Sequence, residues 1–131
     1  MYASIMRFMA AIYSADVPLA TRFGAAVTPS LRLHYDAFID GCIAAIDGRD
    51  AAARGFRAEV ERRAASARLG WYHVGMIDGL LGDAAEATAH VAQSFAQHES
   101  VCSLGAVDPS YDRVRGDARF RAVVRSMGLP D

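Results

Sequence analysis

Apolar residues recur at helical spacing along nearly the whole chain, and no stretch shows the strict apolar–polar alternation of a half-buried strand. Near the start, Ile5, Phe8, Met9 and Ile12 follow the i, i+3, i+4, i+7 spacing that places side chains on one face of a helix. The same periodicity predicts a short helix after Asp16 and further helices over about residues 31–47, 50–69, 71–81, 84–100 and 118–127. We therefore predict an all-α fold.

Short polar stretches separate the predicted helices. In LLGDAAEA, residues 80–87, a glycine stands directly before an aspartate, and DGRDAAA, residues 47–53, nearly repeats this arrangement. Glycine readily adopts the left-handed conformation that ends a helix, and aspartate accepts hydrogen bonds from the first turn of the next one. We expect Asp16, Ser30, Asp50, Asp83 and Asp117 to cap helices, with Glu86 completing a capping box. Links this short join antiparallel helices, so the chain is predicted to form helical hairpins.

The two glycines, Gly48 and Gly82, are 34 residues apart. Further pairs share this offset: Gly41 and Gly75, Ile43 and Ile77, Phe38 and Tyr72, Ala51 and Ala85, and Ala53 and Ala87. A helix–turn–helix unit with this period is typical of the tetratricopeptide repeat, and the chain resembles that family. The resemblance implies a right-handed solenoid of stacked antiparallel hairpins with about two to three repeats.

The second copy, residues 68–101, matches the family pattern better than the first copy, residues 34–67. It has Trp71, Gly75, Gly82 and Ala87 at matching positions, and it departs from the pattern at Asp78 and Ser94. The first copy keeps Gly41, Gly48 and Ala53 but has Ala37 at the aromatic position and Arg57 at a bulky one. A glycine at 41 or 75 that faces an alanine at 53 or 87 would let two helices pack closely.

The tail, residues 108–130, resembles the segment that closes many bacterial tetratricopeptide proteins. Its apolar stripe of Phe120, Val123, Val124 and Met127 predicts a helix that covers the open end of the stack. Residues 1–33 have the right size for a degenerate third repeat, although pairing with a second copy of the chain would also cover that end. We interpret residues 1–131 as one domain.

Composition excludes several function classes. Hydrophobic residues make up 53% of the chain, and the net charge is −1, which gives no electrostatic reason to bind nucleic acid or an anionic membrane. No apolar run approaches the roughly 18 residues of a membrane span.

All 14 basic residues are arginine, which indicates GC-rich coding and a bacterial source. With only Cys42 and Cys102 and no Cys-x-x-Cys pair, we expect buried thiols in the reducing cytoplasm, although the sequence does not exclude a disulfide between them.

Candidate chemical groups are scattered. His90 and His98 are eight residues apart, too far to ligate one metal from one helix, and His34 and His73 stand alone. Cys42 lies among apolar residues, which predicts burial rather than nucleophilic reactivity. The arginines at 54, 57, 62, 63 and 68 alternate with Glu59 and Glu61, as on a solvated helix face. We therefore expect no metal, no cofactor and no catalysis.

The resemblance assigns a concave partner-binding face to the first helix of each repeat. The matching residues are Tyr35, Phe38, Cys42, Ile46, Leu69, Tyr72, Met76 and Leu80, with His73 beside them. This apolar set predicts binding of an apolar or amphipathic helix, from another protein or from a second copy of the chain. Two alternatives remain open: the N-terminal helices cover these residues, or the chain is the C-terminal regulatory part of a bacterial cyclase, kinase or transcriptional regulator.

Overall fold

A computed structural model of the chain describes residues 2–129, and in this range it contains α-helices and short 3-10 helices but no strand. The all-α prediction is confirmed. In chain order the elements are α1 (Tyr2–Tyr13), α2 (Val17–Ala25), α3 (Pro29–Ile46), α4 (Asp50–Ala65), α5 (Trp71–Leu81), α6 (Ala84–Ala96), the 3-10 helices η1 (Ser100–Ala106) and η2 (Pro109–Tyr111), and α7 (Ala118–Ser126).

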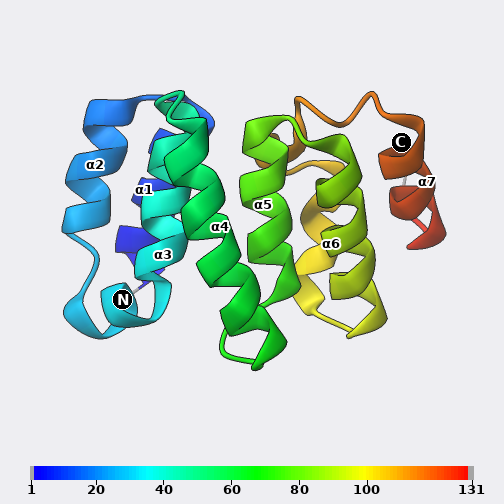
Figure 1. The fold of residues 1–131 in the computed structure, drawn as a ribbon, viewed down its shortest axis with the longest axis horizontal. Helices are drawn as coiled ribbons and strands as arrows, with labels where there is room; N and C mark the ends of the chain where they lie inside the picture. Colours follow the sequence, from blue (N-terminus) through cyan, green and yellow to red (C-terminus); the bar gives the residue numbers. More distant parts are fainter. Residues whose placement is uncertain (1, 130–131) are drawn as a thin grey trace.

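Neighbouring helices in the sequence pack as pairs: α1 on α2, α3 on α4 and α5 on α6. The pairs stand side by side along the long axis of the molecule, with α4 against α5, and α7 packs on α6 at the far end (Figure 1). Helix α3 also contacts α5, and η2 contacts α5. None of the helices described in residues 2–129 combines the length and apolar character that crossing a membrane requires.

The helix stops predicted at Gly48 and Gly82 are confirmed. Gly48 and Gly82 have φ of 72° and 79°, in the left-handed region that glycine tolerates, and Gly128 at the end of α7 has φ of 75°. Side chains cap three of the following helices: Asp16, Asp83 and Asp117 accept hydrogen bonds from the backbone N–H groups of Leu19, Glu86 and Arg119. The turns between paired helices therefore use the local chemistry that the sequence predicted.

Three predicted caps are wrong. Helix α3 begins one residue before Ser30, because Pro29 already occupies its first turn, where a missing N–H has no cost. Asp50 is the first residue of α4 rather than its cap. Glu86 does not complete a capping box, since its carboxylate accepts a hydrogen bond from Arg57, at 2.7 Å.

Two helices end earlier than predicted. Helix α4 ends at Ala65 and α6 at Ala96, and each is followed by a residue with positive φ: Ala67 (56°) and His98 (58°). Phe95, which the periodicity placed on the apolar face of α6, is 39% exposed. Neither stop is marked by a glycine, so periodicity alone extended both helices too far.

Gly41 and Gly75 do lie at close helix contacts, but their nearest neighbours are not Ala53 and Ala87. A side chain at Gly41 would lie 3.1 Å from Cβ of Phe56 on α4 and 2.8 Å from Ile77 on α5. A side chain at Gly75 would lie 3.4 Å from Val91 on α6 and 2.9 Å from the hydroxyl of Tyr111 in η2. Each glycine therefore admits both its partner helix and the next element along the stack.

Gly79 makes the tightest approach in α5. A β-carbon there would clash with the main-chain oxygen of Ser110 in η2 and would lie 2.9 Å from the Tyr111 ring. The Tyr111 ring stacks on Phe120 of α7, with 5.1 Å between ring centres, and both side chains are fully buried. The packing of η2 on α5 therefore also positions α7, through the contact between Tyr111 and Phe120.

Glu99 fixes the start of α5 from a distant point in the sequence. Its carboxylate accepts hydrogen bonds from the backbone N–H groups of Trp71 (2.8 Å) and Tyr72 (3.1 Å) and from the hydroxyl of Ser94 (2.7 Å). A negative charge at a helix N-terminus is stabilising, because the free N–H groups and the helix dipole both favour it. The link after α6 is thereby tied to α5.

Two glycine-to-alanine substitutions test the packing of η2 on α5. We expect Gly79→Ala to lower the free energy of unfolding by about 1–3 kcal/mol, because the new methyl group meets backbone that has no flexible side chain to move. Gly55→Ala is the matched control, since it lies inside α4 with open space around it. It should raise stability by about 0.5–1 kcal/mol through helix propensity. Urea denaturation of both variants measures the difference, and a Gly79→Ala protein as stable as Gly55→Ala would contradict the contact.

Candidate functional site

A cavity of about 330 Å³ opens between α1 and η1, with α3 and α5 lying between them. We call this cavity the groove. Its lining residues are Ile5, Met6, Met9, Tyr13, Leu31, Tyr35, Phe38, Tyr72, His73, Met76, Val101, Leu104 and Asp108. All but two of these side chains are apolar or carry an aromatic hydroxyl.

The groove has a buried floor and an exposed apolar rim. On α3 and α5, Phe38, Tyr72 and Met76 are at most 5% exposed. On α1, Met6 and Tyr13 are 65% and 40% exposed, and on η1 the side chains of Val101 and Leu104 are also exposed. Seven large hydrophobic side chains are exposed among residues 3–129, and these four surround the groove.

An aromatic cluster occupies the side of the groove formed by α3 and α5. The His73 ring stands perpendicular to Phe38, with 5.0 Å between ring centres, and lies 5.5 Å from Tyr35. Burial lowers the pKa of His73, so its imidazole is neutral at pH 7. The cluster therefore presents uncharged rings to the groove.

Among the described residues that line the groove, Asp108 alone is charged, and it is 5% exposed. Its carboxylate accepts hydrogen bonds from the hydroxyl of Tyr72 and from the backbone N–H of Ser110, both at 2.9 Å. Burial, followed by the negative charge of Asp108, raises the pKa of the Tyr13 and Tyr72 hydroxyls well above the ordinary value, so both stay protonated. Within residues 2–129, Asp108 forms no ion pair.

Five of the nine predicted binding residues line the groove: Tyr35, Phe38, Tyr72, His73 and Met76. The other four do not. Cys42 is fully buried, Leu69 is 8% exposed, and Ile46 and Leu80 are half-buried away from the cavity.

Helix α1 explains part of the difference between the predicted concave face and the groove. Helix α1 supplies side chains above α3, so the N-terminal segment covers part of the predicted concave face and forms one wall of what stays open. Sequence reasoning missed the residues on α1 and η1, because a repeat pattern does not show which segment folds back over the stack. It also missed Asp108, whose position after a loop carried no sign of burial.

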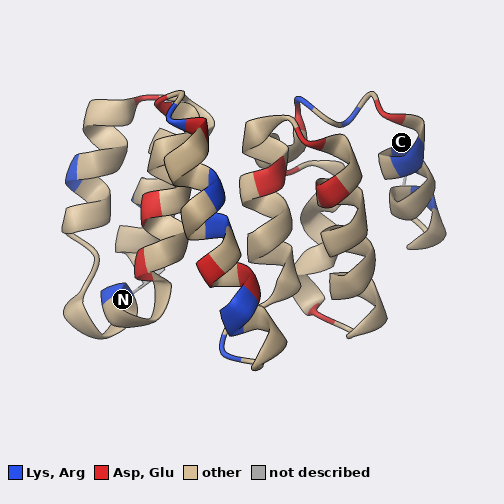
Figure 2. Cartoon of the chain, in the orientation of Figure 1, with Lys and Arg blue, Asp and Glu red and all other residues tan. Residues whose placement is uncertain are grey.

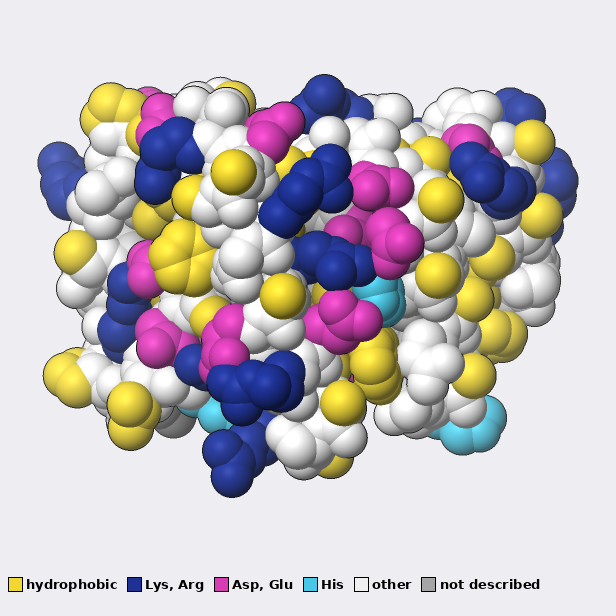
Figure 3. Space-filling model, viewed as in Figure 1, with side chains coloured by type: hydrophobic (Ala, Val, Ile, Leu, Met, Phe, Trp, Pro, Cys, Tyr) yellow, Lys and Arg dark blue, Asp and Glu magenta, His cyan; other side chains and the backbone are white. Residues whose placement is uncertain are grey.

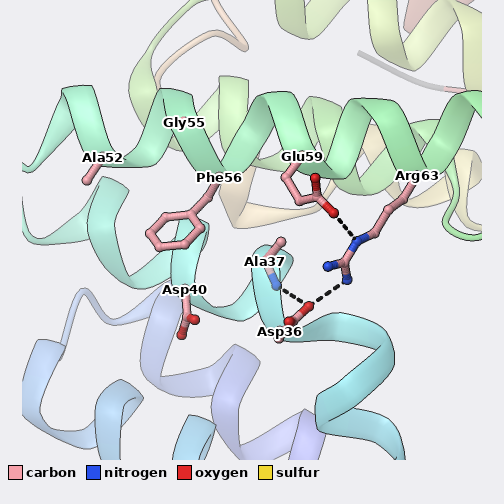
Figure 4. A pocket seen from close by; sticks show the side chains of 8 residues that line it. All are labelled: Asp36, Ala37, Asp40, Ala52, Gly55, Phe56, Glu59 and Arg63. Atoms are coloured by element: carbon pink, nitrogen blue, oxygen red, sulfur yellow. Dashed lines mark hydrogen bonds and ion pairs between the residues drawn. The ribbon is translucent and has the colours of Figure 1, made fainter.

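A second cavity, of about 440 Å³, lies between α3 and α4. Figure 4 shows the ring of Phe56 and the small residues of both helices lining it, with Arg63 bridging Glu59 and Asp36 at distances of 2.7 and 2.5 Å. The remaining acid, Asp40, is paired with Arg32 at 2.6 Å. Because these acids already have partners, this cavity offers a ligand less unsatisfied charge than the groove does.

A buried network of charged groups joins α4, α5 and α6. Asp78 on α5 is fully buried and contacts Arg57 on α4 at 2.6 Å and Nδ1 of His90 on α6 at 2.7 Å. Arg57 also pairs with Glu61 and Glu86, and Nε2 of His90 lies 3.7 Å from Glu61. The prediction that Arg57 lies on a solvated helix face is therefore wrong, since its side chain is only 17% exposed.

Charged residues crowd along α4 and are sparse on α5 and α6 (Figure 2), and side chains of opposite sign adjoin a histidine across the middle of this face (Figure 3). The Trp71 ring stacks on His90, with 5.7 Å between ring centres. Burial alone would lower the pKa of His90, but the hydrogen bond and the negative charge of Asp78 outweigh it, and the pKa is raised. The network therefore binds a proton more tightly in the folded state.

Other chemistry finds little support in the described part of the chain. No group of three or more His, Cys, Asp or Glu side chains in residues 2–129 converges in a way that could hold a metal ion. Cys42 and Cys102 are both buried free thiols, and burial raises the pKa of each. No protein-family model matches the chain, and neither a curated protein nor a solved structure is significantly similar to it.

His90 and His73 should affect the pH dependence of stability with opposite sign. The raised pKa of His90 gives stability that is present below about pH 6.5 and is lost as pH rises through the folded-state value. Replacing His90 by Gln should therefore cost more stability in mild acid than at alkaline pH. The lowered pKa of His73 has the reverse effect, so His73→Gln should cost more above about pH 6.5 than below it.

Thermal unfolding from about pH 5 to pH 9 measures both differences, each taken against the wild-type chain at the same pH. The groups that face His90 are Asp78 and Trp71 from α5 and Arg57 and Glu61 from α4. A His90→Gln cost that does not grow toward acid pH would contradict the proton on the Asp78–His90 pair. A His73→Gln cost that does not grow toward alkaline pH would contradict the lowered pKa of His73.

Proposed function

We propose that this chain is a tetratricopeptide-like, non-catalytic module whose groove binds an amphipathic helix of another protein. The paired helices support the repeat interpretation, as do the matching left-handed turns at Gly48 and Gly82, 34 residues apart. In this interpretation α3–α4 and α5–α6 are two repeats, α1–α2 is a degenerate third, and α7 closes the stack.

The observation that carries the proposal is the apolar rim around a buried apolar floor. Exposed apolar area is unfavourable in water by about 25 cal/mol per Å², and a partner that covers Met6, Tyr13, Val101 and Leu104 would recover that free energy. An amphipathic helix places side chains at i, i+3, i+4 and i+7 along one face, so it can cover both α1 and η1 and insert one side chain between them. The flexible methionine at the rim can adapt to such a side chain.

A second copy of the chain fits the groove less well. Outside the groove, the exposed large hydrophobic side chains among residues 3–129 are Leu33 on α3, Phe95 on α6 and Val107 between η1 and η2, and they form no stripe. Contact of groove with groove would bring two buried Asp108 carboxylates together, which like-charge repulsion disfavours. We therefore favour a different protein as the partner.

The two buried free thiols also support a reducing compartment, and we propose the bacterial cytoplasm. The alternative that the chain is the regulatory part of a larger signalling protein stays a prediction. In either setting the groove would bind a helix.

A displayed library of peptides of about 14 residues, with a fixed apolar stripe and variable remaining positions, supplies the probe. We expect selection on the whole chain to yield peptides that become helical when bound. Met6→Glu and Leu104→Glu should each weaken a selected peptide by about tenfold or more, because each puts a charge at the apolar contact. Fluorescence anisotropy of the labelled peptide measures the affinity.

Leu33→Glu is the matched control, since Leu33 is 79% exposed on α3 and does not line the groove. It should leave peptide affinity unchanged. Circular dichroism confirms that each variant is folded. Selection of no helical peptide, or equal affinity for all three variants, would overturn the proposal, and so would sedimentation as a dimer that Met6→Glu converts to a monomer.

A further inference from the structure

The groove holds a carboxylate beside several uncharged aromatic rings, and these features point to a cation. We propose that the groove binds the ammonium group of a lysine on the partner helix, with Asp108 as its counter-ion and Tyr35, Phe38, Tyr72 and His73 around its methylene chain. This inference rests on the proposed helix-binding function and names the side chain that the groove selects.

Within residues 2–129, the buried Asp108 carboxylate has no ion-pair partner. A buried carboxylate without a counter-ion is unfavourable, and a cation brought beside it in a low-dielectric cavity interacts strongly. The two basic side chains that follow it in the sequence are engaged elsewhere. Arg113 donates to the main-chain oxygen of Leu80 at 2.7 Å, and Arg115 donates to the main-chain oxygen of Asp108 at 2.8 Å and pairs with the Asp112 carboxylate at 2.9 Å.

Aromatic rings line the groove together with Asp108. The negative faces of phenol and phenyl rings attract cations, and the attraction grows when water is excluded. Tyr35 and Phe38 meet the His73 ring at 5.5 and 5.0 Å, and Tyr72 donates directly to Asp108. Because the His73 imidazole is neutral at pH 7, no positive charge on this wall opposes a bound cation.

The contacts of Asp108 favour lysine over arginine. Its two oxygens accept from the Tyr72 hydroxyl and the Ser110 N–H, and the Tyr13 hydroxyl also interacts with this carboxylate, which leaves little capacity for the two parallel hydrogen bonds of a guanidinium. An ammonium acts as a point charge and needs only one open acceptor position. A long methylene chain also suits the apolar walls, on which Met9 and Met76 lie.

Titration of the full chain with n-butylammonium, which reproduces the lysine side chain beyond its α-carbon, tests the site directly. We expect butylammonium to shift the NMR signals of the Met6, Met9 and Met76 methyl groups with a dissociation constant on the order of millimolar. n-Butanol, which has the same carbon chain and no charge, should bind at least about tenfold more weakly. This comparison needs no variant.

Asp108→Asn should weaken butylammonium binding by about tenfold or more and leave butanol binding unchanged. Asparagine can keep both hydrogen bonds, since its oxygen can accept from Ser110 while its amide donates to the Tyr72 hydroxyl. Asp112→Asn is the matched control: it removes the same charge from a neighbouring side chain that is 67% exposed, and it should leave binding unchanged. A melting temperature for each variant shows that it is folded.

Butanol that bound as well as butylammonium, or an Asp108→Asn protein that bound butylammonium like the wild type, would overturn the lysine site. The selected peptides separate this inference from the proposed function. A helical peptide that binds the wild type and Asp108→Asn equally would overturn the lysine site and leave helix binding intact. Butylammonium binding without any selected peptide would overturn helix binding, and with it a partner lysine as the source of the cation.

Discussion

The groove depends on the close packing of η2 against two glycines of α5, Gly75 and Gly79. Gly79 lets the main chain of Ser110 lie directly on the helix, and Gly75 admits the hydroxyl of Tyr111. That hydroxyl donates to the main-chain oxygen of Tyr72, at 3.2 Å. Since Asp108 stands just before this packed segment, the contact also sets where its carboxylate lies. Gly75, which we predicted would let two helices pack closely, therefore also helps to fix the segment that forms one side of the groove.

Arg57 and Asp78 are each costly to bury alone, and they stabilise each other by forming an ion pair. The Arg57 side chain on α4 is 17% exposed, and the Asp78 side chain on α5 is fully buried. In the structure their side chains meet at 2.6 Å, and His90 completes the pairing of Asp78. Either residue alone would leave a charge buried without a partner, which is strongly destabilising. Together they link the two central hairpins through a directional contact.

Local signals in the sequence were sufficient for most of the fold. The left-handed glycines and the capping acids act within a few residues, so Gly48, Gly82 and Asp83 predicted where α3 and α5 end and where α6 begins. Stops without such residues were missed, as at the ends of α4 and α6, where Ala67 and His98 adopt the left-handed conformation instead. Their conformation is set by the chain around them rather than by residue type.

The groove was only partly predictable, because its features depend on contacts between distant segments. The period of 34 placed Phe38 and Tyr72 on one side of the stack, and both line the groove. Glu99 is 28 residues beyond the N–H of Trp71 that it binds, and Asp108 is 36 residues beyond the hydroxyl of Tyr72. No periodicity connects such pairs, and an acid in a loop is ordinarily expected to be exposed.

The identity of residue 108 bears on what the groove is for. An asparagine at this position would accept from the Ser110 N–H, but its amide would reverse the bond to the Tyr72 hydroxyl and leave that hydroxyl proton without an acceptor. The carboxylate accepts from both donors at the cost of burying a charge. That cost falls when a cation comes near, and the cavity that leads to Asp108 is lined by apolar and aromatic side chains. The chemistry of this one position thus favours a partner that brings a positive charge on an apolar stem.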